Sequence, residues 1–476
     1  MKLFDFRNRQ NRKIKIDDLT CEYKEYILNL AKNDPWYPSF HIAPKHGLLN
    51  DPNGLIEIDG VYHIFHQWYP AGPVHGLKYW YHYTTTDFIN YNDMGIGMYP
   101  EYDFDKDGCY TGMAIKEKNG NISVYYTGVH GEEIEPCIGK ADLINGEIVN
   151  RRNICSYDKN ISTLNIRDPF VYHNNDEKVI LLGFENKNNK GQIGIFKENN
   201  DTVEYKGILK MKDMDFGYML ECPNYFETEE NGVIIFSPQG IKSTNKYDFR
   251  NVFSVVYSVG EKIDLKSNEF NSNEFYEIDK GFDFYAPQVF KDEKGREILI
   301  GWLGNSKCIY PSDKNQWAHM LTIPREVTIE NDRIVQKPID ELLNLRDKEI
   351  IINDELDLKS KAFEIVFEGT ENFEIVIEND KNENIKFSSK DNEYILDRSK
   401  MTYLYNEEYG NVRYAKRLEK SKHSIRIFFD NSAIEIFCDN RKTVFTGRVY
   451  IDNISKIKVK NTKAILYYMK KININN

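Results

Sequence analysis

Apolar and polar residues alternate along most of this chain with the two-residue period of β-strands. Short runs rich in aromatic and β-branched residues lie between Gly, Asn and Asp residues, for example at 60–69, 121–129, 178–185 and 232–240. Helical spacing almost vanishes beyond residue 54. The pattern therefore predicts an all-β protein with many turns.

A helix is predicted near the N-terminus. Within residues 17–33, apolar side chains recur at roughly helical spacing, namely those of Leu19, Tyr23, Tyr26, Ile27 and Leu30. Acidic residues stand at the front of this segment, where they complement the helix dipole. We expect residues 1–33 to form a helical extension that lies against the main body.

A weak internal repeat follows this extension. Proline precedes an apolar or aromatic strand at Pro52, Pro169, Pro223 and Pro287, and the last two intervals are 54 and 64 residues. The first interval is about twice as long, so a further unit is expected near residue 110, where a small-residue turn precedes another strand. Five units of four strands each predict a five-bladed β-propeller over residues 34–335, with the first turn of each blade facing the central axis.

The pattern changes after residue 335. Residues 336–350 are interpreted as a short helical linker. Strict alternation then resumes in residues 351–476, with apolar positions on one face of each strand and charged positions on the other. This part predicts a β-sandwich, and it shows no candidate chemistry.

Composition narrows the possible partners. The chain has 476 residues, with 63 Lys and Arg against 74 Asp and Glu, and the net charge of −11 opposes binding to nucleic acid or an anionic membrane. Seven scattered cysteines without a C-x-x-C pair indicate free thiols. The N-terminus has no apolar core for a signal peptide, and no run approaches a membrane span, so we expect a cytoplasmic protein.

Three acidic residues stand at the predicted blade turns. Asp51, Asp168 and Glu221 lie at the proline turns that head the first, third and fourth units. A propeller would bring them to one funnel, where repulsion and burial separate their pKa values. Paired carboxyl groups of this kind hydrolyse glycosidic bonds, although each acid taken alone could be a turn cap.

The sequence offers no metal or cofactor motif. Its ten histidines show no paired spacing beyond His63 and His66, which would face opposite sides of a strand. We therefore predict neither a metal nor a cofactor. The sequence does not specify an oligomeric state.

Five motifs together resemble glycoside hydrolase family 32, the β-fructofuranosidases. They are HGLLNDPNGL (46–55), YHIFHQWYP (62–70), IRDPFVY (166–172), YMLECPNYF (218–226) and DFYAPQVF (283–290). The resemblance covers nearly the whole chain and implies a sugar substrate. It implies that Asp51 is the nucleophile, Glu221 the acid/base and Asp168 the stabiliser of the transition state.

The resemblance also implies a set of residues around the sugar. These are Leu48, Leu49, Asn50, Gln67, His75, Tyr110, Thr111, Arg167, Tyr285 and Trp302. The chain departs from the commoner family pattern at Leu48-Leu49, where Trp-Met is usual, and at Tyr110-Thr111, where an aromatic residue precedes Ser. These departures affect the expected contacts with the ring and not the three acids.

A finer resemblance concerns the substrate. Segments 72–83 and 309–327 are similar to the intracellular branch of the family, which hydrolyses sucrose 6-phosphate, and His75 stands where many secreted relatives have Trp. The resemblance implies that some of five basic residues ring a phosphate, namely Lys78, Lys307, Lys314, His319 and Arg325. The alternatives are a sucrose or fructan hydrolase without phosphate preference, an inverting arabinan-type hydrolase and a non-catalytic sugar-binding propeller.

Overall fold

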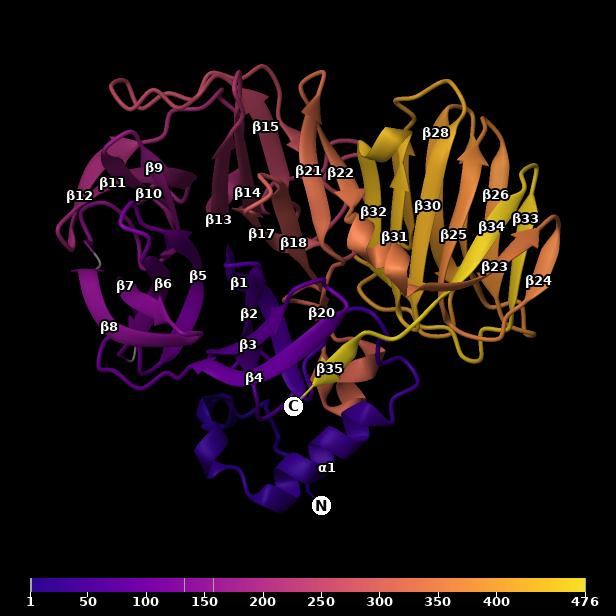
Figure 1. The fold of residues 1–476 in the computed structure, drawn as a ribbon, viewed down its shortest axis with the longest axis horizontal. Helices are drawn as coiled ribbons and strands as arrows, with labels where there is room; N and C mark the ends of the chain where they lie inside the picture. The colour runs from indigo at the N-terminus through magenta and orange to yellow at the C-terminus, as the bar shows by residue number, and fades with distance from the viewer. Residues whose placement is uncertain (1, 132, 157, 476) are drawn as a thin grey trace.

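The computed structural model describes residues 2–131, 133–156 and 158–475, and it divides into a propeller and a sandwich of strands (Figure 1). Before the first blade the chain forms two 3-10 turns, η1 (Arg9–Lys13) and η2 (Ile16–Asp18), and the helix α1 (Cys21–Lys32). Thr20 caps α1 by accepting the Tyr23 N–H at 3.2 Å. The helix is shorter than the predicted 17–33 because this cap starts it at Cys21.

Five sheets form the blades. In each sheet the strands follow chain order from the axis outward, apart from the short additional strands described below. The first contains β1 (Gly47–Ile58), β2 (Val61–Tyr69), β3 (Tyr79–Thr85) and β4 (Asn90–Met98). The second contains β5 (Gly108–Lys116), β6 (Ile122–His130), β7 (Glu135–Ile144) and β8 (Glu147–Ser156). The third contains β9 (Ile166–Asn174), β10 (Glu177–Glu185), β11 (Gly191–Asn199) and β12 (Thr202–Ile208).

The last two blades complete the ring. The fourth contains β13 (Gly217–Glu227), β14 (Gly232–Gly240), β15 (Val256–Gly260) and β16 (Tyr276–Glu277). The fifth contains β17 (Tyr285–Lys291), β18 (Glu297–Leu303), β20 (Met320–Leu321), β21 (Arg325–Glu330) and β22 (Arg333–Pro338), with the turn η3 (Pro311–Asn315) inserted. The predicted five-bladed propeller is confirmed.

Two short strands tie the first blade to distant parts of the chain. β19 (Trp317–Ala318) pairs with β1, so a segment that follows the fifth blade's second strand closes the ring. β35 (Asn473–Asn475) pairs with the outer strand β4, and Figure 1 shows the C-terminus beside the first blade. The end of the chain, predicted to belong to the sandwich, thus covers a sheet edge of the propeller.

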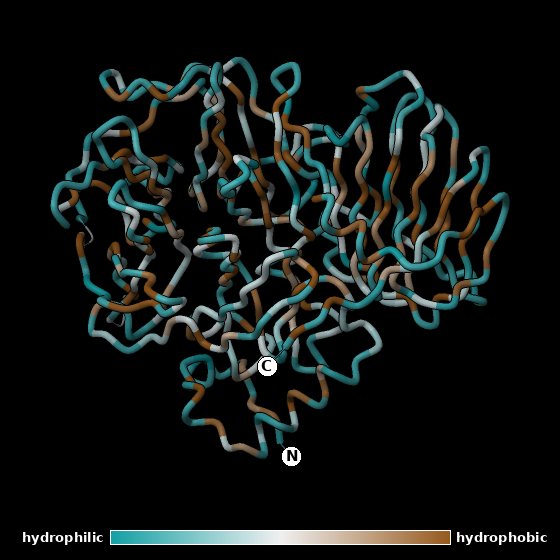
Figure 2. The backbone as a smooth tube through the Cα atoms, viewed as in Figure 1, coloured by the Kyte–Doolittle hydropathy of each residue, from teal (hydrophilic) through white to brown (hydrophobic). Residues whose placement is uncertain are grey.

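The second part is a sandwich of two six-stranded sheets, as predicted. One sheet contains β23 (Arg346–Ile352), β34 (Ala464–Met469), β25 (Ala362–Gly369), β30 (His423–Asp430), β31 (Ala433–Cys438) and β32 (Thr443–Arg448). The other contains β24 (Glu355–Asp357), β33 (Lys456–Lys460), β26 (Phe373–Glu378), β27 (Asn384–Lys390), β28 (Glu393–Lys400) and β29 (Val412–Lys416). The turn η5 (Asp439–Arg441) joins β31 to β32. Figure 2 shows apolar segments along the strands and polar residues at the turns of the sandwich.

The segment between the two parts contains little helix. Within 336–350 the chain makes one 3-10 turn, η4 (Asp340–Leu345), and β23 starts directly after it. Arg346 favours the strand because its guanidinium pairs with Glu364 and stacks on the Tyr467 ring. The domain limits given above stay a prediction.

All seven cysteines are free thiols. Within the described ranges, none of the helices combines the length and the apolar character that a membrane-spanning helix needs.

Candidate active site

Each innermost strand carries a β-bulge at the same place. The register shifts at Leu49/Pro52 in the first blade, Cys109/Gly112 in the second, Glu221/Asn224 in the fourth and Tyr285/Gln288 in the fifth, and between Arg167 and Phe170 in the third. Asp168, Cys222 and Ala286, which precede the repeated prolines, have positive φ of 63°, 48° and 44°. A bulge bends the strand and turns two successive side chains toward the axis.

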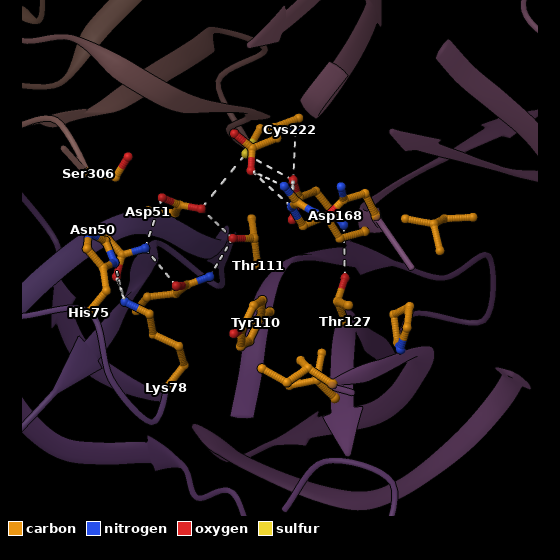
Figure 3. Close-up of a pocket in the computed structure, with 18 of the residues that line it drawn as sticks. Asn50, Asp51, His75, Lys78, Tyr110, Thr111, Thr127, Asp168, Cys222 and Ser306 are labelled. Carbon is orange, nitrogen blue, oxygen red and sulfur yellow. Dashed lines mark hydrogen bonds and ion pairs between the residues drawn. The ribbon is translucent and has the colours of Figure 1, made fainter. Parts of the chain in front are cut away.

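The bulges generate two matching sets of residues. Asp51, Thr111, Asp168, Cys222 and Ala286 form the first set, and the residues just before them form the second, namely Asn50, Tyr110, Arg167, Glu221 and Tyr285. All except Ala286 line a cavity of about 470 Å³ at the propeller axis (Figure 3). This volume is within the range of small-molecule sites. Glu221 therefore belongs to a different position of the repeat from the two aspartates.

Asp51 is held by a closed chain of hydrogen bonds from the first two blades. Thr111 Oγ1 donates to its Oδ2, and Asn50 Nδ2 donates to its Oδ1 at 3.1 Å. Gln67 joins these donors, because its Oε1 accepts from Asn50 at 2.6 Å and its Nε2 donates to Thr111 at 2.5 Å. Burial raises the pKa of Asp51 above its ordinary value, and the charge of Glu221 adds to this rise, while the Thr111 bond opposes it.

Asp168 lies across the cavity from this chain of bonds. Its backbone N–H donates to Thr127 Oγ1 at 2.9 Å, and its Oδ2 accepts the Cys222 N–H at 3.0 Å. Burial raises the pKa of Asp168 to about 7; Arg167 opposes the rise, and the charges of Glu221 and Asp51 reinforce it.

Cys222 joins the two aspartates. Its Sγ lies 3.8 Å from Asp51 Oδ2 and 3.5 Å from Asp168 Oδ2, as Figure 3 shows. Burial and the neighbouring carboxylates raise the pKa of this thiol far above its ordinary value, so it stays protonated and can donate. The thiol therefore contacts both aspartates.

Glu221 is surrounded by donors from three blades. Arg167 donates to its Oε1 from Nε at 2.9 Å and from Nη2 at 2.7 Å. Tyr285 Oη and Gln239 Nε2 donate to its Oε2 at 2.6 and 2.5 Å. Trp302 packs beside this group, with its ring centroid 6.1 Å from that of Tyr285 and 5.7 Å from that of His75.

Nearly the whole predicted set meets at this cavity. Its wall includes Asp51, Asp168, Glu221, Asn50, Gln67, His75, Tyr110, Thr111, Arg167, Tyr285 and Trp302. Leu48 and Leu49 are the exceptions, because they are 2% and 0% exposed and pack in the core, where Leu49 O lies 3.1 Å from His319 Nδ1. Their expected contact with the sugar ring is not supported.

Sequence reasoning missed several residues of the wall. Gln239, Thr127 and Ser306 lie outside the family motifs. Strand pairing within the blades brings Gln239 and Thr127 to the cavity, and Ser306 reaches it from the loop after β18. In the part of the chain that the structure describes, no group of three or more His, Cys, Asp or Glu side chains could hold a metal ion.

Comparison with known proteins agrees with this geometry. The N-terminal domain of glycosyl hydrolases family 32 matches residues 41–338, and the C-terminal domain of that family matches residues 333–475. A sucrose-6-phosphate hydrolase of Vibrio alginolyticus is 40% identical over 95% of this chain and 94% of its own length. One from Staphylococcus xylosus is 33% identical, with 96% of each chain covered.

Solved structures give the same result. Sucrose-6-phosphate hydrolase from Lactobacillus gasseri superimposes with a TM-score of 0.92 at 29% identity, covering 98% of this chain and 99% of that one. The Bombyx mori GH32 β-fructofuranosidase BmSUC1 has a TM-score of 0.82 at 25% identity, covering 97% and 100% of the two chains. With both of its domains matched and its acidic residues gathered at the propeller axis, the chain belongs to glycosyl hydrolases family 32.

Proposed function

We propose that this protein is a retaining β-fructofuranosidase that hydrolyses sucrose 6-phosphate and releases fructose. The meeting of Asp51, Asp168 and Glu221 in one cavity, each with different partners, carries the proposal. The sucrose-6-phosphate hydrolases among its relatives support the substrate. Because such a phosphorylated sugar arises during uptake, we also propose a cytoplasmic location.

The first step forms a covalent intermediate. An Asp51 carboxylate oxygen bonds to the anomeric carbon of the fructosyl unit as the bond from that carbon to the glycosidic oxygen breaks. Glu221 gives its proton to the departing oxygen. Asn50 and Thr111, which donate to opposite oxygens of Asp51, hold its carboxylate in one orientation for the attack.

The second step returns the enzyme to its starting state. Water attacks the anomeric carbon, Glu221 accepts the water proton, and the bond to Asp51 breaks. Arg167, Tyr285 and Gln239 donate to the two oxygens of Glu221 and hold its carboxylate in place for this step. The ester on Asp51 is neutral, so the repulsion between the two carboxylates is absent while Glu221 acts as the base.

We propose that Asp168 stabilises the transition state. It is buried, and among the described residues its closest ion pair is the 4.0 Å approach to Arg167 Nε; one of its oxygens takes no part in the bonds described above. We assign it to the fructosyl hydroxyl groups, whose hydrogen bonds to a carboxylate strengthen as positive charge develops on the ring.

The basic residues that the sequence associates with phosphate are widely separated. Lys314 lies over the rings of Trp36 and Tyr403, and Arg325 is fully buried against Glu435. His319 is buried and accepts the Trp302 N–H at 2.9 Å. Three side chains with these contacts are unsuited to binding a phosphate at the mouth of the cavity.

Lys307 is the best-placed candidate for the phosphate. It is exposed, follows the cavity-lining Ser306, and lies with Nζ 5.0 Å from the Phe253 ring centroid. A cation at the mouth offsets the long-range repulsion between a dianionic substrate and a chain of net charge −11. We therefore propose that Ser306 and Lys307 contact the phosphate on the glucosyl side.

The deciding experiment compares kcat/KM for sucrose 6-phosphate and for sucrose. We expect the phosphorylated substrate to be favoured at least about tenfold, or about 1.4 kcal/mol, with the advantage falling as salt rises. Lys307→Met should remove most of this advantage, whereas Lys314→Met, a matched loss of a lysine, should keep it. Equal values for both substrates at low salt would leave a general β-fructosidase.

Stereochemistry tests the mechanism separately. Retention requires the carboxyl groups of Asp51 and Glu221 to lie about 5 to 5.5 Å apart. NMR of the first-formed fructose should show the anomer of the substrate. First release of the opposite anomer would favour the inverting, arabinan-type reaction.

A further inference from the structure

Lys78 lies on the nucleophile's side of the cavity. Its side chain starts at the end of the 71–78 loop, and the residue is 5% exposed. Nζ donates to Asn50 Oδ1 at 2.6 Å and to His75 Nδ1 at 3.0 Å. Across the described ranges, no carboxylate oxygen reaches ion-pair distance from it. Burial lowers the pKa of Lys78 to about 7, while the charge of Asp51 opposes this shift, so below neutral pH the side chain is an ammonium held on neutral partners. Burying such a charge costs several kcal/mol, so folding alone does not explain it.

The ammonium determines how its two partners are oriented. An ammonium group donates three hydrogen bonds and accepts none. The side of the Asn50 amide that faces Lys78 must therefore be the oxygen, and Nδ2 is left to donate to Asp51 and Gln67. If this amide turned over, Asp51 would face a second oxygen.

Lys78 also determines the tautomer of His75. Because Nδ1 accepts from Lys78, the ring proton must be on Nε2. Burial lowers the pKa of His75 well below its ordinary value, and Lys78 adds to this effect, so the ring stays neutral. His75 Nε2 is buried and has no hydrogen-bond partner within the described part of the protein, and the residue lines the cavity. The N–H is thus available to a substrate oxygen.

Two cationic side chains are found among the described residues of the cavity wall, those of Arg167 and Lys78. Arg167 is bound to Glu221. The charge of Lys78 acts on Asp51, whereas that of Arg167 acts on Asp168. The other groups that face this cluster are the protonated Cys222, the neutral His75 and His319, and Arg12, a cation of the N-terminal segment whose charge acts on His75.

We propose that Lys78 is a positioning residue for the nucleophile: its ammonium orients the Asn50 amide toward Asp51, sets the tautomer of His75, and supplies the positive charge that keeps Asp51 ionised. The inference rests on the role proposed for Asp51. It leaves Lys78 no part in holding the phosphate, which the sequence had suggested.

The test compares pH profiles of kcat/KM for the wild-type protein and Lys78→Met. The acid limb reports ionisation of the carboxylates as a coupled group. Without the ammonium, we expect this limb to move up by about one pH unit, because a nearby opposite charge lowers a carboxyl pKa by about that much or more. Lys78→Arg, which also only donates, should keep the limb near its wild-type position even if kcat falls.

Lys140→Met is the control for loss of a buried lysine. Lys140 pairs with Glu198 and Asp201 outside the cavity wall, so its loss should lower Tm and leave the limb in place. Lys78→Met should fold, because methionine has a similar volume and removes an unpaired charge. An acid limb that stays within about 0.2 pH unit of wild type in Lys78→Met overturns the proposal.

A second measurement does not depend on turnover. The infrared carboxyl band of Asp51, isolated as the difference between wild type and Asp51→Asn, reports its ionisation directly. The midpoint of this band should also rise in Lys78→Met, and an unchanged midpoint would reject the role of Lys78. Absence of hydrolysis in the wild type would instead reject the proposed function.

Discussion

Two clusters of buried carboxylates in this molecule differ in how their charge is balanced. At the propeller axis, the closest cation to Asp51 or Asp168 at ion-pair distance among the described residues is Arg167, whose Nε lies 4.0 Å from Asp168 Oδ2. At the contact between propeller and sandwich, Asp430 and Glu435 are equally buried but surround His41 and Arg325. The first cluster raises carboxyl pKa values, and the second lowers that of Glu435.

The interface cluster joins segments that lie far apart in the sequence. His41 Nδ1 lies 2.9 Å from Asp430 Oδ2, and His41 Nε2 lies 3.0 Å from Glu435 Oε1. Arg325 donates to Glu435 Oε2 from Nε at 3.2 Å and from Nη2 at 2.6 Å. Asp430 also accepts the backbone N–H groups of residues 39, 40 and 41 at 2.7 to 3.0 Å. Every charge here has a close partner, which is what a buried structural cluster needs.

The comparison separates stability from reactivity. Burial opposes ionisation in both clusters, and close cations overcome it only at the interface. At the axis the carboxyl groups remain poised to gain or lose a proton, which acid/base and nucleophilic chemistry requires. The comparison predicts that mutations at the axis affect turnover and mutations at the interface affect folding.

The largest expected effect is on catalysis. Asp51→Asn should lower kcat by about 10⁴-fold or more, because the amide cannot form the covalent intermediate. Its Tm should stay equal to that of the wild type or rise, since a buried carboxylate with a raised pKa is removed. Steady-state kinetics and thermal unfolding of one preparation measure both. A variant that keeps a tenth of wild-type kcat would exclude Asp51 as the nucleophile.

The interface should show the opposite behaviour. Glu435→Gln leaves His41 and Arg325 short of negative charge, so the free energy of unfolding should fall by about 3 to 5 kcal/mol. Folded protein at low temperature should keep its kcat. Glu177→Gln, which breaks the exposed pair with Lys197, is the control and should cost about 1 kcal/mol or less. Equal Tm values for these two variants would contradict the comparison.

Within the cavity, the effect of losing Glu221 should depend on the leaving group of the substrate. Glu221→Ala should slow substrates with a poor alkoxide leaving group by about 10²- to 10⁴-fold, because they need a proton as they depart. An aryl fructoside should be affected far less. The measurement is kcat/KM for the two substrates, and equal damage to both would assign Glu221 to binding.

The smallest effect concerns pH and stability. Burial lowers the pKa of His41, but hydrogen bonds and charges of Asp430 and Glu435 outweigh it and raise this pKa to about 9. The protonated ring therefore stabilises the fold fully below its unfolded pKa of about 6.5, and this contribution is lost as pH rises through about 9. Tm measured from pH 6 to 10 should fall less steeply in His41→Gln than in the wild type. Parallel curves would show that His41 does not carry the effect.

Local patterns were sufficient to predict much of the molecule. Period-two alternation predicted the strands, and the repeated prolines at 52, 169, 223 and 287 predicted the blades. The turns that hold Asp51, Asp168 and Glu221 follow from the same short motifs, because proline and the bulge after each turn are local features. The sequence alone thus determined the fold class and the acidic residues that meet at the axis.

Tertiary structure decided what each charge meets. The sequence placed both Arg325 and Lys78 among residues for a phosphate, but packing turns Arg325 to Glu435, 110 positions away, and buries Lys78 against Asn50. Leu48 and Leu49 lie beside the nucleophile in sequence yet pack in the core. A pKa depends on burial and on the charges a few ångströms away, and residues distant in the sequence supply both only once blades and sandwich have packed.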